Sequence, residues 1–232
     1  NSVRLPGKNL RPMLGKPLLV WAIETAKKSG KINRILVSTP DEELANMARE
    51  AGAEVPYLEP PEISAKGGSI ERLMRYAAEW LEKNEEYVPD ALVLLQTTNP
   101  LRLPHHLDEA ISLFEKSGAH CVSAVSPATA TNHHNWMFMR DADGNVVTGT
   151  GGKLKDMPTR SQELPPCFIR NDICFVIRPE NLRSDPPTLW GEKMELYLMD
   201  EIFNTDINTE EDWNVTENKL LRLLNRPLSS SS

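Results

Sequence analysis

The feature that most constrains the fold is an alternation of short apolar runs with longer segments of helical pattern. The apolar runs are residues 34–39, 54–58, 91–95 and 121–125, and the helical patterns are residues 17–28, 40–51, 69–83 and 104–118. Short, nearly continuous apolar strands are typical of strands buried on both faces. Their alternation with helices predicts an α/β protein of three layers, with helices on both faces of a mostly parallel sheet.

Helix boundaries are indicated by capping residues. The first helix is expected to end at Gly30 in the C′ position. The second is expected to begin with Thr39 as N-cap and Pro40 in the first helical position, and to end at Gly52. A final helix is predicted over residues 210–224. In a parallel sheet the ligand lies beyond the carboxyl ends of the strands, so the loops after strands are where functional residues are expected.

The alternation stops between residues 126 and 166. Asn, His, Gly, Pro and Thr dominate there, and a turn at 141–144 separates two short strand candidates at 136–139 and 146–148. About 40 residues of this composition are too many for an ordinary connection. We interpret this segment as a hairpin-bearing excursion that packs on a second subunit.

The excursion divides the chain. We expect residues 1–125 and 167–228 to form the α/β core and residues 126–166 the excursion. Residues 229–232, a run of serines, are expected to be a disordered tail. Because the sequence opens directly in loop-like residues, the first strand of the core is expected to be missing.

Composition excludes some classes of function. The chain has 26 Lys and Arg against 33 Asp and Glu, a net charge of -7, which disfavours nucleic-acid binding because that depends on neutralising phosphates. No apolar run approaches the roughly 20 residues of a membrane-spanning helix. The three cysteines show no CxxC spacing, which favours a reducing, cytoplasmic setting.

A basic segment opens this acidic chain. Residues 1–16 carry a charge of +4 and the remaining residues sum to -11; the four cations are Arg4, Lys8, Arg11 and Lys16. The sequence Pro6-Gly7-Lys8-Asn9 adds a tight turn whose backbone amides and lysine suit a phosphate group. We expect Lys8 to be exposed and ready for an anion, and the alternative is a merely solvated basic segment.

Carboxylates gather near the other end of the chain, at Asp200, Glu201, Asp206, Glu210, Glu211 and Asp212. Loop carboxylates suit a hard cation such as Mg²⁺ that also binds substrate phosphates. Residues 210–212 are better explained as acids at a helix N-terminus. Asp206, which lies before the helix, is the better metal candidate.

Two histidine pairs suggest a metal site less strongly. His105 and His106 lie near two acids, and His133 and His134 form a second pair, but no matching second half of a zinc motif is evident. The helix start at residues 104–109 is the preferred explanation for the first pair. Cys121 and Cys174 lie in apolar strands and are predicted to be core residues.

Several motifs occur together and in order. They are residues 2–10 (SVRLPGKNL), 15–18 (GKPL), 37–39 (VST), 95–102 (LQTTNPLR), 162–165 (QELP), Asn171 and 206–210 (DINTE). In this set the chain resembles the acylneuraminate cytidylyltransferases, also called CMP-sialic acid synthetases, over nearly its whole length. The resemblance implies a Rossmann-like nucleotidyltransferase fold, and a homodimer whose dimerisation element is the excursion.

The resemblance also implies an activity and its site residues. The anomeric hydroxyl of a 2-keto-3-deoxy sugar acid would attack the α-phosphorus of CTP and expel pyrophosphate. Ser2, Lys8 and Asn9 would hold the nucleotide, with Arg4 and Ser38 as further substrate-binding positions. Gln96, Arg102 and Asn171 would face the sugar, and Lys153 and Arg160 would reach the partner's active site. Asp206, with Asn208, would hold Mg²⁺; Lys8 and Asp206 are the expected catalytic pair.

Five departures from the family pattern surround the expected pocket. Asn208 stands where a second metal aspartate is usual, Asp172 follows Asn171 where a glycine is usual, and the 97–102 loop reads TTNPLR. Glu59 replaces an arginine, and Lys66 an aspartate. The sugar is therefore expected to differ from sialic acid. Two alternatives remain: a catalytically impaired nucleotide-sugar binding protein on the same fold, or a cytidylyltransferase for another acid such as an octulosonic acid.

Overall fold

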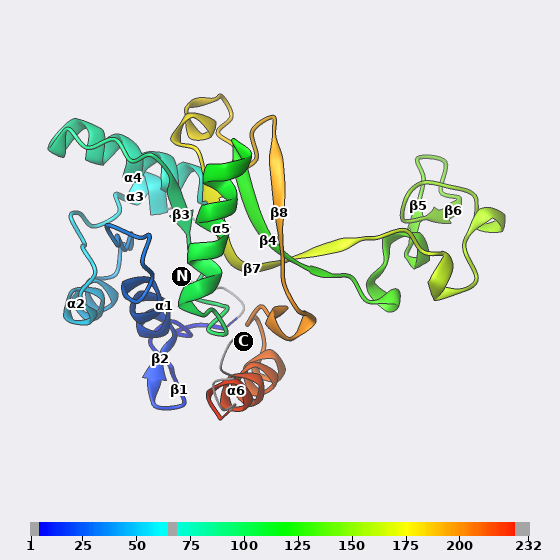
Figure 1. Ribbon diagram of the computed structural model, residues 1–232, viewed down its shortest axis with the longest axis horizontal. Helices are drawn as coiled ribbons and strands as arrows, with labels where there is room; N and C mark the ends of the chain where they lie inside the picture. The colour runs from blue at the N-terminus through cyan, green and yellow to red at the C-terminus, as the bar shows by residue number, and fades with distance from the viewer. Residues whose placement is uncertain (1–4, 65–68, 226–232) are drawn as a thin grey trace.

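The computed structural model describes residues 5–64 and 69–225, and its centre is a four-stranded sheet (Figure 1). The strand order is β3 (Leu92–Leu94), β7 (Phe168–Ile177), β4 (Cys121–Pro127) and β8 (Met194–Leu198). β4 and β8 are parallel, whereas β7 pairs antiparallel with both β3 and β4. Three strands thus share one direction and β7 opposes them.

Within the four-stranded sheet, β7 departs from the direction that the other strands share, and the excursion explains why. β4 leads out to the excursion and β7 leads back, so the two strands are the legs of one long hairpin (Figure 1). Antiparallel neighbours need no crossover helix between them. The segment between these two strands accordingly contains no α-helix, only short 3-10 turns and a small hairpin.

Helices cover both faces of the sheet, as the three-layer prediction requires. On one face, α5 (Pro104–Ser117) packs Leu107 and Ile111 against Val122 and Val176. On the other face, α4 (Ile70–Glu85) approaches Phe175 and neighbouring apolar side chains. Alternate residues of β7 therefore enter opposite cores, the period of two that a strand imposes.

Three more helices and one short turn complete the core. α1 (Leu18–Lys27) packs against α2 (Glu42–Ala51) in one cluster, while Leu18 of α1 joins Trp213 and Leu220 of α6 (Glu210–Leu224) in another. The helical turn α3 (Pro61–Ser64) precedes α4. No helix among residues 5–64 and 69–225 is both long and apolar enough to cross a membrane.

Two predicted strands are reduced to a single contact. Residues 34–39 and 54–58 form one parallel bridge, between Leu36 and Glu54, in which Val37 N donates to the Glu54 carbonyl at 2.9 Å and Glu54 N donates to the Ile35 carbonyl at 2.8 Å. A short strand is maintained by ladder hydrogen bonds along its length. Within the described residues the main sheet begins at β3, so these two segments lack a continuous ladder.

The caps confirm some predicted helix ends and correct others. α2 ends at Gly52, which has a φ of 92°, and α6 begins at Glu210 with Thr209 as N-cap. The N-cap of α2 is Asp41 and not Thr39, because the Asp41 carboxylate accepts hydrogen bonds from two amides of the first turn. Gly30 is not the predicted left-handed C′ residue: α1 is capped by Lys28 in a right-handed conformation.

The excursion, which in the structure comprises residues 128–167, projects away from the core (Figure 1). It contains the predicted hairpin, formed by β5 (Phe138–Arg140) and β6 (Val146–Thr148) around a turn closed by Gly144 N and the Asp141 carbonyl. The rest is short 3-10 turns. Its buried side chains are only His133 and Thr148.

Candidate functional site

A tight turn positions the start of the site. Gly7 adopts a φ of 72°, a left-handed conformation that glycine reaches without strain, and its carbonyl accepts hydrogen bonds from the amides of Leu10 and Arg11. The chain then forms the small hairpin of β1 (Pro12–Met13) and β2 (Lys16–Pro17) and enters α1. The predicted turn around Gly7 is therefore present, immediately before the first helix.

Lys8 reaches from this turn to the far end of the chain. Its Nζ donates a hydrogen bond of 2.6 Å to the carbonyl of Ile207, and only 7% of the residue is exposed. The residue it contacts stands between Asp206 and Asn208. The expectation that Lys8 is exposed in the free protein is wrong, because the ammonium is buried against the segment that carries the candidate metal ligand.

Asp206 is exposed beside this contact. The Asn208 side-chain amide donates to Asp206 Oδ2 at 2.6 Å, and Ile207 between them is fully buried with Met13, Leu18 and Leu101. The buried isoleucine anchors the segment, and its two polar neighbours remain at the surface. The arrangement presents carboxylate oxygens to solvent next to a lysine.

The loop after β3 joins the same place. Thr97 Oγ1 donates to Asn9 Oδ1 at 2.7 Å, and the Thr98 carbonyl accepts from the Ile207 amide at 3.3 Å. Three segments distant in sequence, the N-terminal turn, residues 96–102 and residues 204–209, thus converge. A lysine, a carboxylate and side-chain amides at one surface supply what phosphate and a hard cation require.

Arg102 is placed differently from expectation. Its guanidinium donates to the carbonyls of Ile173, Gln96 at 2.8 Å and Asp172 at 3.4 Å, and only 3% of the residue is exposed. Burial lowers the pKa of Arg102 to about 10. Its donors are directed at backbone, so Arg102 holds the 96–102 loop to β7 and does not face a sugar.

Asn171 is likewise a structural residue in this geometry. It is 1% exposed, its side-chain amide donates to Ser126 Oγ at 3.1 Å, and its Oδ1 accepts from the Ile173 amide at 3.2 Å. Asn99, which the sequence did not single out, is fully buried and donates to the carbonyls of Asn171 at 2.6 Å and Phe203 at 2.9 Å. The only feature of the sequence that pointed to Asn99 is its position in the 95–102 motif.

Asp172 places a buried carboxylate at this junction. The side chain is 10% exposed, its Oδ1 lies 2.9 Å from Arg170 Nε, and the backbone has a φ of 57°. Burial raises the pKa of Asp172, the charge of Asp206 raises it further, and Arg170 and Arg102 oppose the shift. The electrostatic influence of Asp206 indicates that both carboxylates belong to one neighbourhood.

The basic segment is less cationic than its sequence suggests. Arg11 pairs with Glu210 at 2.6 Å and lies over the Trp213 ring, and Lys16 pairs with Glu24 at 2.5 Å. Both pairs are partly exposed, where such contacts are worth little in stability. They do neutralise two of the four cations, so the anion site predicted from the +4 charge depends on Lys8 and on Arg4, which lies outside the described residues.

The other expected substrate-binding residues are scattered. Ser38 Oγ is shielded from solvent beside Tyr57, and the Gln96 side chain is half-buried at the end of β3. Lys153 and Arg160 are exposed in the excursion, away from the core of their own chain (Figure 1). Ser2, like the departure at Lys66, lies outside the described residues.

Residues 210–212 and the first histidine pair lie at helix starts, as predicted. Asp212 accepts from the amides of Asn208 and Thr209 and thereby caps α6. His106 is buried at the start of α5, where its Nδ1 accepts from the Leu103 amide at 3.2 Å. Burial lowers the pKa of His106 to about 3, so this ring is neutral.

The chain is similar to known proteins over most of its length. A family profile described as cytidylyltransferase matches residues 1–149. CMP-N,N'-diacetyllegionaminic acid synthase of Legionella pneumophila is 28% identical over 96% of this chain and 92% of its own length. N-acylneuraminate cytidylyltransferase A of Danio rerio is 29% identical over 95% of this chain, which spans 49% of that longer protein.

Solved structures share the fold. A CMP:2-keto-3-deoxy-manno-octonic acid synthetase complexed with CTP superimposes with a TM-score of 0.70 at 14% identity, covering 96% of this chain and 95% of the other. The 4-diphosphocytidyl-2C-methyl-D-erythritol synthase of Anaerococcus prevotii gives a TM-score of 0.63 at 14% identity, covering 93% and 92%. At these identities the likeness concerns the fold.

Proposed function

The chain belongs to the cytidylyltransferase family and is a nucleotidyltransferase that uses CTP, and we propose that its acceptor is a sialic-acid-like 2-keto-3-deoxy sugar acid. The relatives that match over most of this chain are named for legionaminic and acylneuraminic acids, which supports this class of acceptor. The observation that supports a nucleotide site is the contact between Lys8 and the carbonyl of Ile207, because it brings the N-terminal turn next to Asp206.

The reaction joins the anomeric oxygen of the sugar acid to the α-phosphorus of CTP. The bond from that phosphorus to the bridging oxygen breaks, pyrophosphate leaves, and the hydroxyl proton passes to solvent or a nearby base. Such transfers depend on positioning and on neutralising charge. The buried hydrogen bond fixes Lys8 in the turn, and the link between Asn9 and Thr97 fixes the loop after β3, so both segments are held ready for the nucleotide.

Mg²⁺ is part of the proposal, and the residues fit it. Mg²⁺ in nucleotide enzymes is held by one or two carboxylates together with substrate phosphates. Asp206 offers exposed carboxylate oxygens, and Asn208 lies within a hydrogen bond of them and can add an amide oxygen. The ion would neutralise phosphate charge. With a neutral Asn208, this pair carries one negative charge fewer than two aspartates would.

The direct test is pyrophosphate release. The protein is incubated with CTP, Mg²⁺ and, separately, N-acetylneuraminic, legionaminic and ketodeoxyoctulosonic acids. We expect release with a nine-carbon acid and strong loss in Asp206→Asn. Release only with the eight-carbon acid would replace the proposed acceptor. CTP binding that ignores Mg²⁺, with no release from any acid, would support the nucleotide-sugar binding protein instead.

A homodimer formed through the excursion completes the proposal. The hairpin exposes Phe138 to 63%, Met139 to 48% and Val146 to 44%. Apolar side chains gathered on a projecting element are typical of an interface. In such a dimer Lys153 and Arg160 would reach the active site of the partner subunit. In their own chain they lie in the excursion, away from the core (Figure 1).

The dimer is tested by sedimentation of the wild type and of Phe138→Asp. We expect a dimer that dissociates in the variant, while Val88→Asp, which also introduces a charge at an exposed apolar position but outside the excursion, stays dimeric. A wild type that is monomeric at micromolar concentration would contradict this part of the proposal. A cytoplasmic location is also proposed, supported by three cysteines that are all free thiols.

A further inference from the structure

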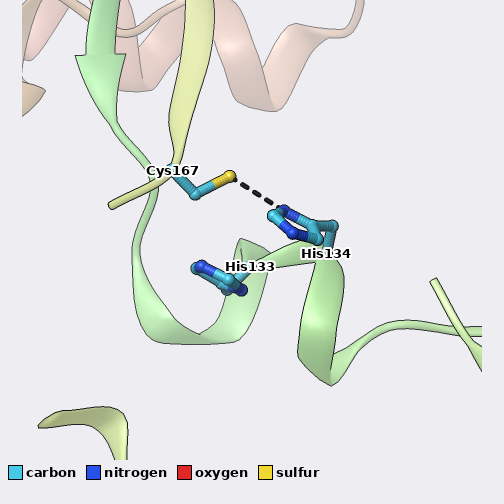
Figure 2. Close-up of side chains that lie close together, drawn as sticks. All are labelled: His133, His134 and Cys167. Atoms are coloured by element: carbon cyan, nitrogen blue, oxygen red, sulfur yellow. Dashed lines mark hydrogen bonds between the residues drawn. The ribbon is translucent and has the colours of Figure 1, made fainter. Parts of the chain in front are cut away.

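Three side chains of types that commonly bind metals meet at the base of the excursion. His133 and His134 lie where two 3-10 turns join, and Cys167 lies directly before β7 (Figure 2). One ligand atom from each residue lies within 4.8 Å of the others. The sequence shows the histidine pair without a partner, and the return of the chain from the excursion supplies the cysteine.

The side chains are already oriented by specific contacts. His134 Nδ1 lies 3.1 Å from Cys167 Sγ, and the two imidazole rings stack with centroids 4.5 Å apart (Figure 2). His133 Nε2 lies 2.8 Å from the Pro165 carbonyl, and its Nδ1 accepts from the Asn135 amide at 3.1 Å. A backbone carbonyl that holds one ring nitrogen of a histidine is the usual support for a metal bond by the other nitrogen.

The cluster is accessible from solvent. Its neighbour is an open cleft of about 310 Å³, lined by His133 and Cys167 among others. His133 itself is buried, whereas His134 and Cys167 are half-buried. An ion can therefore enter, and a water molecule can occupy a coordination position that the three side chains leave open.

The excursion has a physical need for such a link. It consists of about 40 residues with two buried side chains, those of His133 and Thr148, no buried aliphatic, Phe, Tyr or Trp side chain and no disulfide. Units below about 40 residues usually require a disulfide, a metal or association to be stable. A metal held by residues 133, 134 and 167 would tie the outgoing and returning segments together.

The geometry points to a zinc-type divalent metal site formed by one nitrogen each of His133 and His134 and the sulfur of Cys167, with water as the fourth ligand. Cys167 loses its proton to solvent on binding, and His133 exchanges its bond from the Asn135 amide for the metal. Bonds of about 2.0 Å to nitrogen and 2.3 Å to sulfur place tetrahedral ligands roughly 3.5 Å apart. The separation of 3.1 Å between His134 Nδ1 and Cys167 Sγ needs to open by a few tenths of an ångström. The ligand atom of His133 lies within 4.8 Å of the other two and completes the set by a side-chain adjustment.

The ligand set separates this site from the Mg²⁺ position. Thiolate and imidazole favour zinc and similar borderline ions, whereas carboxylate and amide oxygens favour Mg²⁺. The cluster lies in the excursion, whereas Asp206 precedes α6, which packs in the core (Figure 1). The inference therefore stands independently of the proposed acceptor.

The test is titration of the chelator-treated, tag-free protein with Zn²⁺, and with Co²⁺ as a spectroscopic probe. We expect one equivalent to bind, and Co²⁺ to give a thiolate charge-transfer band in the near ultraviolet. Cys167→Ser should abolish that band, and His134→Asn should weaken affinity at least about tenfold. The control His105→Asn alters an exposed histidine outside the cluster and should change neither.

The band can be assigned to Cys167 because Cys121 and Cys174 are fully buried in the sheet, where a metal ion from solvent does not reach them. Burial also raises the pKa of both thiols to about 12. The inference fails if the folded wild type binds no Zn²⁺ at micromolar concentration, or if Cys167→Ser and His134→Asn bind it as tightly as the wild type. Circular dichroism of each variant confirms that the comparison is made between folded proteins.

Discussion

The core site and the excursion are held together in opposite ways. In the core, buried polar side chains donate to distant backbone carbonyls. Lys8 donates to Ile207, Asn99 donates to Asn171, and Arg102 donates to Gln96 after β3 and to the middle of β7. In the excursion, hydrogen bonds are mostly local to turns, and the surface is exposed. Contacts between distant segments hold the core site, whereas we propose that the excursion is stabilised by a partner subunit and a bound metal ion.

This contrast shows that the type of a residue does not determine whether its role is structural or functional. Arg102 and Arg160 were both expected to bind substrate, yet one is buried against carbonyls and the other is exposed. A buried donor must be satisfied inside the protein, because leaving it unpaired costs about 1–3 kcal/mol. Arg102 therefore serves the fold of its loop, whereas Asp206 is a group of the core site that stays exposed to solvent.

The largest effect is expected at Asp206. Asp206→Asn removes the exposed carboxylate but keeps the side-chain shape, so pyrophosphate release should fall by about 10²–10³. The unfolding free energy should stay within about 0.5 kcal/mol of the wild type, because the residue is a surface one. Steady-state kinetics and urea unfolding measure the two quantities. If the unfolding free energy fell far enough to account for the lost pyrophosphate release, Asp206 would be a structural residue.

Arg102 should give the next largest effect, this time on stability. Arg102→Lys can keep one of three carbonyl contacts, so the unfolding free energy should fall by about 2–4 kcal/mol in urea titrations. Arg140→Lys is the matched control, because Arg140 donates to the Gly144 carbonyl at an exposed position of the excursion. Equal losses of unfolding free energy in Arg102→Lys and Arg140→Lys would show that the buried contacts of the core contribute no more to stability than the exposed contact of the excursion.

Lys8 should affect both activity and stability. Lys8→Met keeps most of the aliphatic chain and deletes the ammonium, leaving the Ile207 carbonyl without its charged donor, at a cost of about 1.5–3 kcal/mol. Turnover should fall as well. Lys155→Met, at an exposed position in the excursion, should change stability by less than about 0.5 kcal/mol. Lost turnover with unchanged stability would show that the buried contact contributes nothing to folding.

The smallest effect is expected at Asp172 and depends on pH. Its folded pKa is raised, so ionisation of this carboxyl opposes folding above that pKa and has no effect below the unfolded pKa of about 3.9. Asp172→Asn should therefore melt at a higher temperature than the wild type at pH 8. The advantage should shrink as pH falls through the folded pKa.

Asparagine tolerates the positive φ of this position, so the substitution leaves the backbone conformation accessible. Asp143→Asn, in the exposed turn of the excursion, is the control and should show no pH-dependent gain. An advantage for Asp172→Asn that is the same at pH 8 and pH 4 would contradict the role given to its charge.

Local signals in the sequence determined much of the fold. Ser69 and Thr209 are N-caps of the helices predicted after them, and Gly52 and Gly118 end α2 and α5 in the left-handed conformation. These signals act between neighbours along the chain, so they can be read without the tertiary structure. The ordered motifs likewise indicated the cytidylyltransferase family before any geometry was known.

Tertiary structure alone decided what depends on contacts between distant residues. The reversed direction of β7, the burial of Lys8 and Arg102, and the approach of Cys167 to His133 and His134 are all set by how the chain returns on itself. A sequence pattern records periodicity and capping, which are local. It does not record which carbonyl a long side chain will reach across the core, because that partner is chosen only when the separate segments pack together.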